Sequence, residues 1–239
     1  MKSLKTKSTP EDIRQKFNLL VERYSNLDEG QNTAVDSPLI AGLIAKTVSE
    51  IHPDAESVMD IGCGAGNYSL RIAGYLPKAN FTLVDLSEKM LEKAEERLKT
   101  KITGSVNTMH NDIRNIKLQN ECFDIVVAGT SLHHLRGEEE WYDVFGKIRE
   151  ALKPGGSFWI SDVVLHDVAE VNSVMWNRYD EFLIKTGGEN LRNWVMEQME
   201  KEDTPRSLNF QIEVLKKVGF RFTEILHKNV NFAAFGGIK

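Results

Sequence analysis

Hydrophobic side chains recur at helical spacing near the start of this 239-residue chain, where two helices are predicted. Thr9-Pro10-Glu11-Asp12 is typical of a helix start, because a hydroxyl cap is followed by proline and then by acids in the first turn. The apolar face of this helix continues through Tyr24. Residues 25–36 are polar and predict a loop, and Ser37-Pro38 begins the second helix.

From residue 56 onward, short apolar runs alternate with helical segments. Each run predicts a buried strand, and each segment between two runs carries apolar residues on one helical face. Strands separated by helices favour right-handed crossovers and a mostly parallel sheet. The predicted strands are 57–61, 81–85, 105–110, 123–128 and 157–164, and the predicted helices are 66–76, one that Ser87 caps, and 138–152.

The final part of the chain departs from this alternation. Residues 165–204 have a helical pattern and contain Trp176 and Trp194. A further helix at 207–218 ends at a glycine, and two strands, 220–226 and 229–235, lie close enough in sequence to form a hairpin.

Composition and charge exclude several classes of protein. The chain is 41% hydrophobic but has no apolar stretch of ~20 residues, so we expect a buried core and no membrane span. The net charge of -5 disfavours a protein that coats nucleic acid non-specifically, although a local basic patch could still bind a folded RNA. Cys63 and Cys122 fit a reducing cytosol and lack the spacing of metal ligands, so we expect a cytoplasmic protein without a metal site.

A glycine-rich turn follows the first predicted strand. Residues 58–66 read VMDIGCGAG, so an apolar run leads to Asp60 and then to three glycines at alternate positions. Glycine permits positive φ and has no Cβ, which lets the backbone approach a ligand closely. A dinucleotide loop of the form G-x-G-x-x-G/A needs a small residue where this chain has Asn67. The loop alone therefore leaves open a dinucleotide, a nucleoside-like cofactor or a simple tight turn.

Acidic residues follow the next two predicted strands. Asp85 can accept both ribose hydroxyls of an adenosine, although a strand-end acid beside a helix N-terminus is also favoured electrostatically. Asp112 can accept the adenine amino group while the next backbone N–H, of Ile113, meets a ring nitrogen; the alternative is an ordinary polar turn. These positions favour a nucleoside-like cofactor.

Four motifs occur in one order: the D-x-G-x-G-x-G loop, the two later acids, the segment 123–135, and the turn Lys153-Pro154-Gly155-Gly156. Residues 56–165 thereby resemble the core of class I S-adenosylmethionine (SAM) methyltransferases. The resemblance implies an α/β, Rossmann-like fold with a seven-stranded, mostly parallel sheet in the order 3-2-1-4-5-7-6 and helices on both faces. It also implies SAM as the cofactor and S-adenosylhomocysteine as the product.

By this resemblance, the cofactor contacts the glycine loop and the ends of the second, third and fourth strands. Cys63, inside the loop, is interpreted as a small buried side chain rather than a nucleophile. The residues expected to bind the cofactor are Asp60, Gly62, Cys63, Gly64, Gly66, Asp85, Leu86, Met90, Asp112, Ile113, Gly129 and Thr130.

The expected organisation is a flexible tail (1–9) and one methyltransferase domain (10–239). Within the domain we expect an N-terminal helical cap (10–50), the SAM-binding core (56–165), a helical substrate lid (166–206), and a final helix with an antiparallel strand pair (207–239). The cap and the lid would cover the cofactor and build the acceptor pocket. Candidate acceptor contacts are Tyr24, His133, Trp176, Arg178, Tyr179 and Arg192, and His133 is also a candidate general base.

Three functions remain open from the sequence. The first is methyl transfer from SAM to an unidentified, small-molecule acceptor by in-line displacement, which needs no base if the acceptor is already reactive. The second is modification of the tRNA wobble uridine, because Glu202-Asp203-Thr204-Pro205 and residues 230–236 are similar to that branch of the family. Members of that branch form dimers, and some bind a carboxylated SAM through an arginine. Arg192 cannot be matched to that arginine, so ordinary SAM is favoured. The third is a non-catalytic SAM-binding module.

Overall fold

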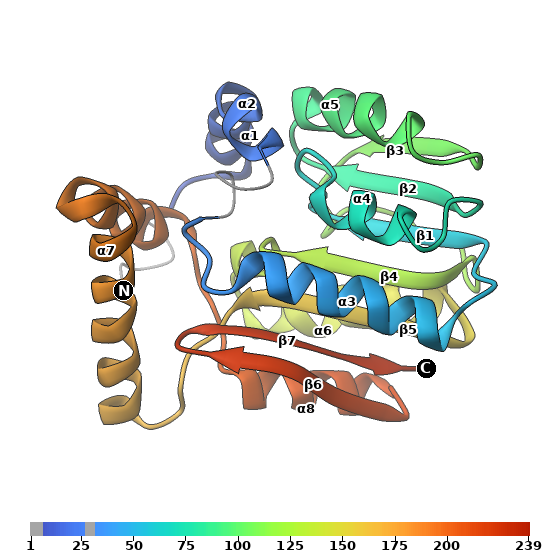
Figure 1. Ribbon diagram of the computed structural model, residues 1–239. Helices are drawn as coiled ribbons and strands as arrows, with labels where there is room; N and C mark the ends of the chain where they lie inside the picture. The colour runs from blue at the N-terminus through green and yellow to red at the C-terminus, as the bar shows by residue number, and fades with distance from the viewer. Residues whose placement is uncertain (1–6, 27–31) are drawn as a thin grey trace.

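Seven strands form one sheet in the order β3-β2-β1-β4-β5-β7-β6 in the computed structural model, which describes residues 7–26 and 32–239 (Figure 1). The first five strands pair in parallel, and the last two add an antiparallel edge. This order confirms the predicted Rossmann-like topology. The strands are β1 (Ser57–Ile61), β2 (Asn80–Asp85), β3 (Val106–His110), β4 (Phe123–Gly129), β5 (Leu152–Val163), β6 (Phe222–Asn229) and β7 (Phe232–Ile238).

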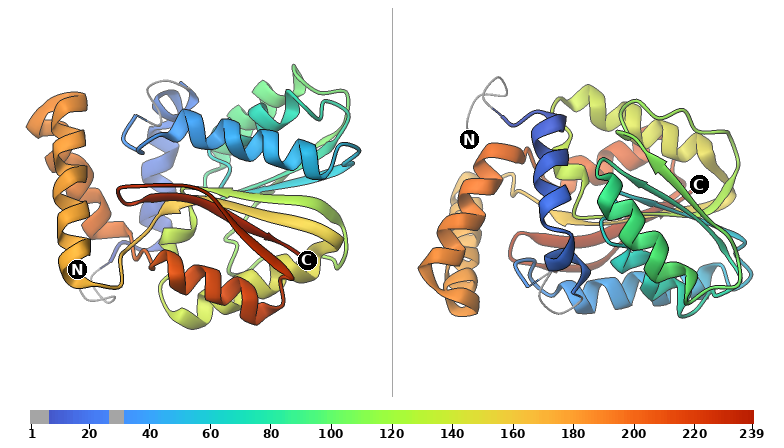
Figure 2. Two further views of the ribbon diagram at one scale, coloured as in Figure 1. Left: turned by 60° about the horizontal axis from the view of Figure 1, so that its bottom comes forward. Right: turned by 90° about the horizontal axis from the view of Figure 1, so that it is seen from above.

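Helices cover both faces of the sheet, as Figure 2 shows from two sides. One face packs against α3 (Ser37–Ile51), α4 (Asn67–Ala73) and α5 (Glu88–Lys99), and the other against α6 (Glu138–Ala151) and α8 (Leu208–Val218). Each face has its own apolar cluster. The central strands are therefore buried on both sides, which explains why they read as continuous apolar runs.

Alternation within β1 determines where its acid points. Val58 belongs to the cluster under α3, α4 and α5, whereas Met59 and Ile61 belong to the opposite cluster. Since successive side chains point to opposite faces, Asp60 faces the α4 side, where it meets Ser69. The acid is thus directed beneath the glycine loop by strand geometry alone.

The N-terminal helix is shorter than predicted. α1 (Pro10–Leu19) begins with the expected capping box, but it ends before Leu20, and a separate turn, α2 (Val21–Ser25), follows. The Leu20 N–H donates to the Phe17 carbonyl at 3.1 Å, which tightens the last turn and ends the helix. The break places the Tyr24 carbonyl within 3.0 Å of the Asn67 side-chain amide, so a tertiary contact overrides the continuous apolar pattern.

The strand pair at the C-terminal edge lies three residues later than predicted at its far end. Its turn is at Val230-Asn231, with Val230 at φ 50°, and β7 continues through Gly236 and Gly237. A Cβ on Gly236 would lie 2.3 Å from the Phe158 carbonyl oxygen, so these glycines permit close strand packing and do not end the strand. β5 likewise begins at Leu152, so the Lys153–Gly156 turn lies within its bounds.

The predicted helical segment after β5 is confirmed as α7 (Ala169–Glu202), which stands beside the carboxyl edge of the parallel strands (Figure 1). It is bent at Gly187 (φ -156°) and Gly188 (φ 77°, ψ -178°), whose dihedral angles are not helical. No helix in the described ranges is both long and apolar enough to cross a bilayer.

Part of the expected N-terminal tail contacts the end of α7. The Lys7 ammonium donates to the carbonyls of Glu200 at 2.7 Å and Asp203 at 2.6 Å, and Ser8 N–H donates to the Lys201 carbonyl at 2.9 Å. Residues 1–6 of that predicted tail, and 27–31 of the predicted loop, lie outside the described residues.

Replacing Gly236 with alanine should destabilise the protein by about 1–3 kcal/mol, since the new methyl group would collide with β5 backbone and the Trp159 ring. Urea unfolding measures the effect. Gly146→Ala in α6 is the matched control, because its Cβ meets no described atom within 4 Å, and it should be neutral or stabilising. Equal stability of the two variants would contradict the register described for β7.

Candidate functional site

A pocket lies at the carboxyl edge of the sheet, between the strand ends, the helices α1 and α2, and the lid helix α7. Its walls include the glycine loop, Asp85 after β2, Thr130 after β4, and Trp194 and Met199 of α7. Ligands of open parallel sheets bind in this position, outside the carboxyl ends of the strands. The cap and lid predicted from the sequence therefore adjoin the predicted cofactor loop.

The three glycines of the loop have different physical roles. All have positive φ, at 62° for Gly62, 50° for Gly64 and 81° for Gly66. A Cβ on Gly62 would lie 2.3 Å from the Ser131 Cβ, and one on Gly66 would lie 3.1 Å from the Ala94 Cβ. A Cβ on Gly64 would meet no described atom within 4 Å, so this residue alone faces open pocket space. Gly66 lies outside the pocket lining and serves the packing of α4 on α5.

Asp85 joins β2 to the glycine loop. One carboxylate oxygen accepts the Gly64 N–H at 2.8 Å, and the other accepts the Ser87 N–H at 2.8 Å. Burial raises the pKa of Asp85, although these backbone hydrogen bonds act against the rise. Each oxygen keeps a second lone pair, so the carboxylate can still accept the hydroxyls of a ribose.

Leu86, Met90, Asp112 and Ile113 also line the pocket, and their predicted contacts with the cofactor stay predictions. The Asp112 carboxylate also accepts the Arg114 Nε–H, with distances of 2.9 and 3.0 Å to its two oxygens. Burial opposes ionisation of Asp112, but the hydrogen bonds from Arg114 keep its pKa below the usual value. Asp112 is therefore an ionised acceptor whose orientation is set by a neighbouring guanidinium.

Asp60 lies beneath the loop and outside the pocket lining. One of its oxygens accepts from Ser69 Oγ at 2.6 Å and Ser69 N at 3.2 Å, and the other has no hydrogen-bond partner among the described residues. Burial raises the pKa of Asp60 to about 7. Its predicted contact with a cationic amino group stays a prediction.

Gly129, Thr130 and Cys63 line the pocket. The packing of Tyr68 also requires glycine at position 129, because a Cβ added there would lie 2.2 Å from the Tyr68 ring. Thr130 adopts φ 52° and donates its N–H to the Ser161 carbonyl at 2.7 Å. Burial, together with nearby Asp85, raises the pKa of the Cys63 thiol well above its ordinary value, so Cys63 is a neutral packing group.

The candidate acceptor residues divide into two groups. Tyr24, His133 and Tyr179 line the pocket, and the Tyr179 hydroxyl donates to the Thr33 carbonyl at 2.7 Å. The other three lie outside the lining that the described residues form: Trp176 packs on the Tyr179 ring, Arg178 is exposed, and Arg192 pairs with Asp180 at 2.7 Å.

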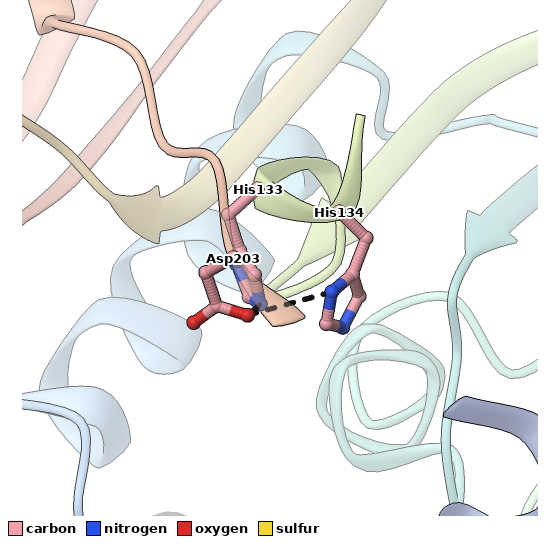
Figure 3. A group of neighbouring side chains, drawn as sticks. All are labelled: His133, His134 and Asp203. Atoms are coloured by element: carbon pink, nitrogen blue, oxygen red, sulfur yellow. Dashed lines mark ion pairs between the residues drawn. The ribbon is translucent and has the colours of Figure 1, made fainter. Parts of the chain in front are cut away.

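His133 and three further side chains, His134, Asp162 and Asp203, meet beside the end of α7, and we call these four the histidine–aspartate cluster. His133 Nδ1 lies 2.5 Å from Asp162 Oδ1, and His133 Nε2 lies 3.6 Å from Asp203 Oδ1. His134 Nδ1 lies 3.5 Å from the same Asp203 oxygen (Figure 3). The two histidines come from the short helix η2 (Leu132–His134), and Asp203 follows α7 directly.

The electrostatics of this cluster disfavour His133 as a free base. Burial opposes the imidazolium form, but the carboxylates of Asp162 and Asp203 outweigh it and raise the pKa of His133 to about 9. An imidazole that is already protonated at neutral pH has no lone pair with which to accept a proton. Burial lowers the pKa of His134 well below its usual value, and neighbouring His133 lowers it further.

The sequence offered only weak signals for the residues that were missed. Asp162 sits in the apolar alternation of β5, where it reads as one polar position in a buried strand. Asp203 belongs to the segment 202–205, whose only signal in the sequence is its similarity to the wobble-uridine branch. The sequence pattern predicts Trp194 as a packing residue of a helix. In the structure it lines the pocket, and the Arg23 guanidinium lies over its ring, 4.4 Å from the ring centre.

Comparisons with known proteins relate this chain to methyltransferases. Residues 58–156 match the family described as "Methyltransferase domain". The chain is 31% identical to a demethylmenaquinone methyltransferase of Leptospira interrogans over 153 residues, which are 63% of this chain and 60% of that protein. It is 28% identical to a carboxy-S-adenosyl-L-methionine synthase of Trichodesmium erythraeum over 208 residues, or 84% of this chain and 79% of that protein.

The solved structures agree on the fold. Human N-acetylserotonin methyltransferase in complex with SAM matches with a TM-score of 0.59 at 16% identity, covering 97% of this chain and 56% of that one. Identity this low shows the fold alone, and the chain aligns with about three fifths of the Leptospira relative. The chain therefore carries a methyltransferase domain over residues 58–156 and has the fold of the class I SAM-dependent methyltransferases, as predicted.

Proposed function

We propose that this protein transfers a methyl group from SAM to a small-molecule acceptor by in-line displacement and leaves S-adenosylhomocysteine. The observation that carries the proposal is one continuous pocket with two chemically different ends. We assign Gly64, Asp85 and Asp112 to the cofactor end of this lining, and the histidine–aspartate cluster to the acceptor end.

The first end fits an adenosine-containing cofactor. The Asp85 carboxylate would accept the ribose hydroxyls, and Asp112 with the Ile113 N–H would meet the adenine. Gly64 supplies the space for close backbone approach. When bound, SAM would supply an electrophilic methyl group on a sulfonium. The protein's own contribution is to hold the acceptor beside that methyl group and to exclude water.

The second end is closed by the cap and the lid. Lys16 of α1 pairs with Glu202 of α7 at 2.5 Å, and Arg23 of α2 stacks on Trp194 of α7. Apolar side chains line this end, among them Ile13, Phe17, Val195, Met199 and Phe232. A pocket lined mainly by apolar side chains supports a small organic acceptor.

Synthesis of carboxy-SAM is the second candidate, because relatives with that name align over 84% of this chain. A carboxylated cofactor would need a free cation in the pocket. Among the described lining residues, Lys16 pairs with Glu202 and Arg114 pairs with Asp112, while Arg192 lies outside the lining. This pairing supports ordinary SAM.

A tRNA acceptor is the alternative to this proposal, whereas a homodimer and a cytoplasmic location are secondary points of it. Arg178 is exposed and could meet RNA, but it lies outside the pocket lining. The free thiols of Cys63 and Cys122 support a reducing compartment.

Asp85→Ala should weaken S-adenosylhomocysteine binding roughly 10–100-fold, because charged hydrogen bonds to buried groups contribute about 1.5–3 kcal/mol. Isothermal titration calorimetry measures the change. Glu213→Ala, an exposed carboxylate on α8, is the control and should bind as the wild type does. Unchanged binding by Asp85→Ala, or no binding by the wild type, would overturn the cofactor assignment.

Incubation with methyl-labelled SAM and separate metabolite and tRNA pools should place the label in the small-molecule fraction. Asp85→Ala should abolish the incorporation, whereas Arg178→Ala should retain it. Label in tRNA alone, lost in Arg178→Ala, would favour the wobble-uridine alternative. Mass spectrometry of the small-molecule fraction would reveal carboxy-SAM if the second candidate is correct.

A further inference from the structure

Three side chains at the lid end of the pocket have the arrangement of a metal site. His133 Nε2, His134 Nδ1 and Asp203 Oδ1 all lie within 4.8 Å of one another. Both nitrogens lie close to the same carboxylate oxygen, at 3.6 and 3.5 Å. Figure 3 shows the two rings and the carboxylate pointing toward one another from η2 and from the end of α7.

These separations suit a transition-metal ion. Bonds of about 2.0–2.2 Å from Zn²⁺ to nitrogen and oxygen place tetrahedral ligands roughly 3.3 Å apart. The two measured distances of 3.6 and 3.5 Å exceed that value by only a few tenths of an ångström. The two nitrogens lie within 4.8 Å of each other, so rotation of the side chains would have to complete the arrangement around a single ion.

His133 is hydrogen-bonded to a carboxylate, that of Asp162, as metal-binding histidines commonly are. Asp162 is fully buried, and its Oδ1 lies 2.5 Å from His133 Nδ1. Its Oδ2 accepts the backbone N–H of His133 at 3.1 Å. A metal ion would displace the Nε2 proton of the His133 imidazolium, while the Nδ1 proton stayed on the hydrogen bond to Asp162. Carboxylates in this position orient metal-binding histidines and raise their basicity.

Backbone contacts hold the ligands together although they are about 70 residues apart in sequence. The Thr204 N–H donates to the His133 carbonyl at 2.7 Å, and the Lys7 ammonium donates to the Asp203 carbonyl at 2.6 Å. His134 Nδ1 is buried and has no hydrogen-bond partner within the described chain. The cluster thus contains a polar atom for which an ion would supply the missing ligand.

We propose that His133, His134 and Asp203 bind one divalent transition-metal ion whose open coordination position faces the acceptor chamber. Two imidazoles and one carboxylate favour Zn²⁺ or Fe²⁺ over Mg²⁺ and Ca²⁺, which prefer oxygen ligands. Three protein ligands leave a position for an exogenous group. All three side chains line the pocket, so that group would share the chamber with the acceptor.

The role of the ion rests on the proposed methyl transfer, whereas the ion site itself does not. The ion would bind a hydroxyl or thiol of the acceptor and lower its pKa, and the released proton would pass to water. The ionised oxygen or sulfur would then form the bond to the methyl carbon as the carbon–sulfonium bond breaks, its electron pair staying on sulfur. The acceptor class is therefore an alcohol, phenol or thiol.

Titration of chelator-treated full-length protein with Co²⁺, followed by visible absorption, tests the site, with Zn²⁺ added as a competitor. We expect one Co²⁺ per chain, displaced by Zn²⁺. His134→Ala and Asp203→Asn should each weaken Co²⁺ binding more than about 100-fold, and Asp162→Asn should weaken it about 10–100-fold. His227→Ala is the matched control, because it removes another histidine–aspartate pair, with Asp36 at 2.9 Å, and should bind Co²⁺ as the wild type does.

A wild type that binds Co²⁺ and Zn²⁺ no more tightly than Asp203→Asn would overturn the proposal; His133 would then be a metal-free cation between two carboxylates. Circular dichroism melting checks that each variant folds, and His134→Gln replaces any variant that does not. S-adenosylhomocysteine titration of the metal-free wild type separates the two claims. If the protein binds S-adenosylhomocysteine but no metal, the metal site is rejected and the proposed methyl transfer stands. If it does not bind S-adenosylhomocysteine, the proposed methyl transfer is rejected, and the Co²⁺ titration alone decides the metal site.

Discussion

The hydrogen bond from the Gly64 N–H to the Asp85 carboxylate, at 2.8 Å, is the contact on which the site depends. It joins the turn after β1 to the end of β2, at the edge where all parallel strands finish. The turn can be reached only with positive φ at Gly62, Gly64 and Gly66. A half-buried carboxylate thereby orients the loop backbone and keeps lone pairs for a ligand. Sheet topology, loop conformation and cofactor recognition meet in this one interaction.

The opposite end of the pocket is built on a different physical basis. Its walls come from α1, α2, η2 and α7, which are distant in sequence and are held by ion pairs, ring contacts and backbone hydrogen bonds. The cofactor end is a property of the sheet, whereas the acceptor end is a property of how the lid docks.

The strand pattern and the cofactor loop could be predicted from the sequence because both depend on local signals. Apolar runs buried on two faces, glycines at a tight turn and acids at strand ends are readable without tertiary information. Asp60 and Gly66 lie outside the pocket lining of the described residues, because the direction of the β1 side chains and the packing of α5 decide their places, and their predicted contacts with the cofactor stay predictions.

The lid could be predicted as helical but not positioned. Its path depends on the bend at Gly187 and Gly188, which determines which faces of α7 reach the pocket. Trp176, Arg178 and Arg192 therefore lie outside the lining, while Trp194 and Asp203 lie within it. Asp162 joins the site through its contact with His133, which is 29 residues away in sequence. The spacing of apolar residues along the chain cannot predict such a contact.

A crystal structure of the complex with S-adenosylhomocysteine tests the central claim most directly. The account predicts both ribose hydroxyls within hydrogen-bond distance of the Asp85 carboxylate, the adenine beside Asp112 and Ile113, and the sulfur directed toward Thr130 and the histidine–aspartate cluster. A nucleoside bound elsewhere, or one whose sulfur faces away from that cluster, would contradict it.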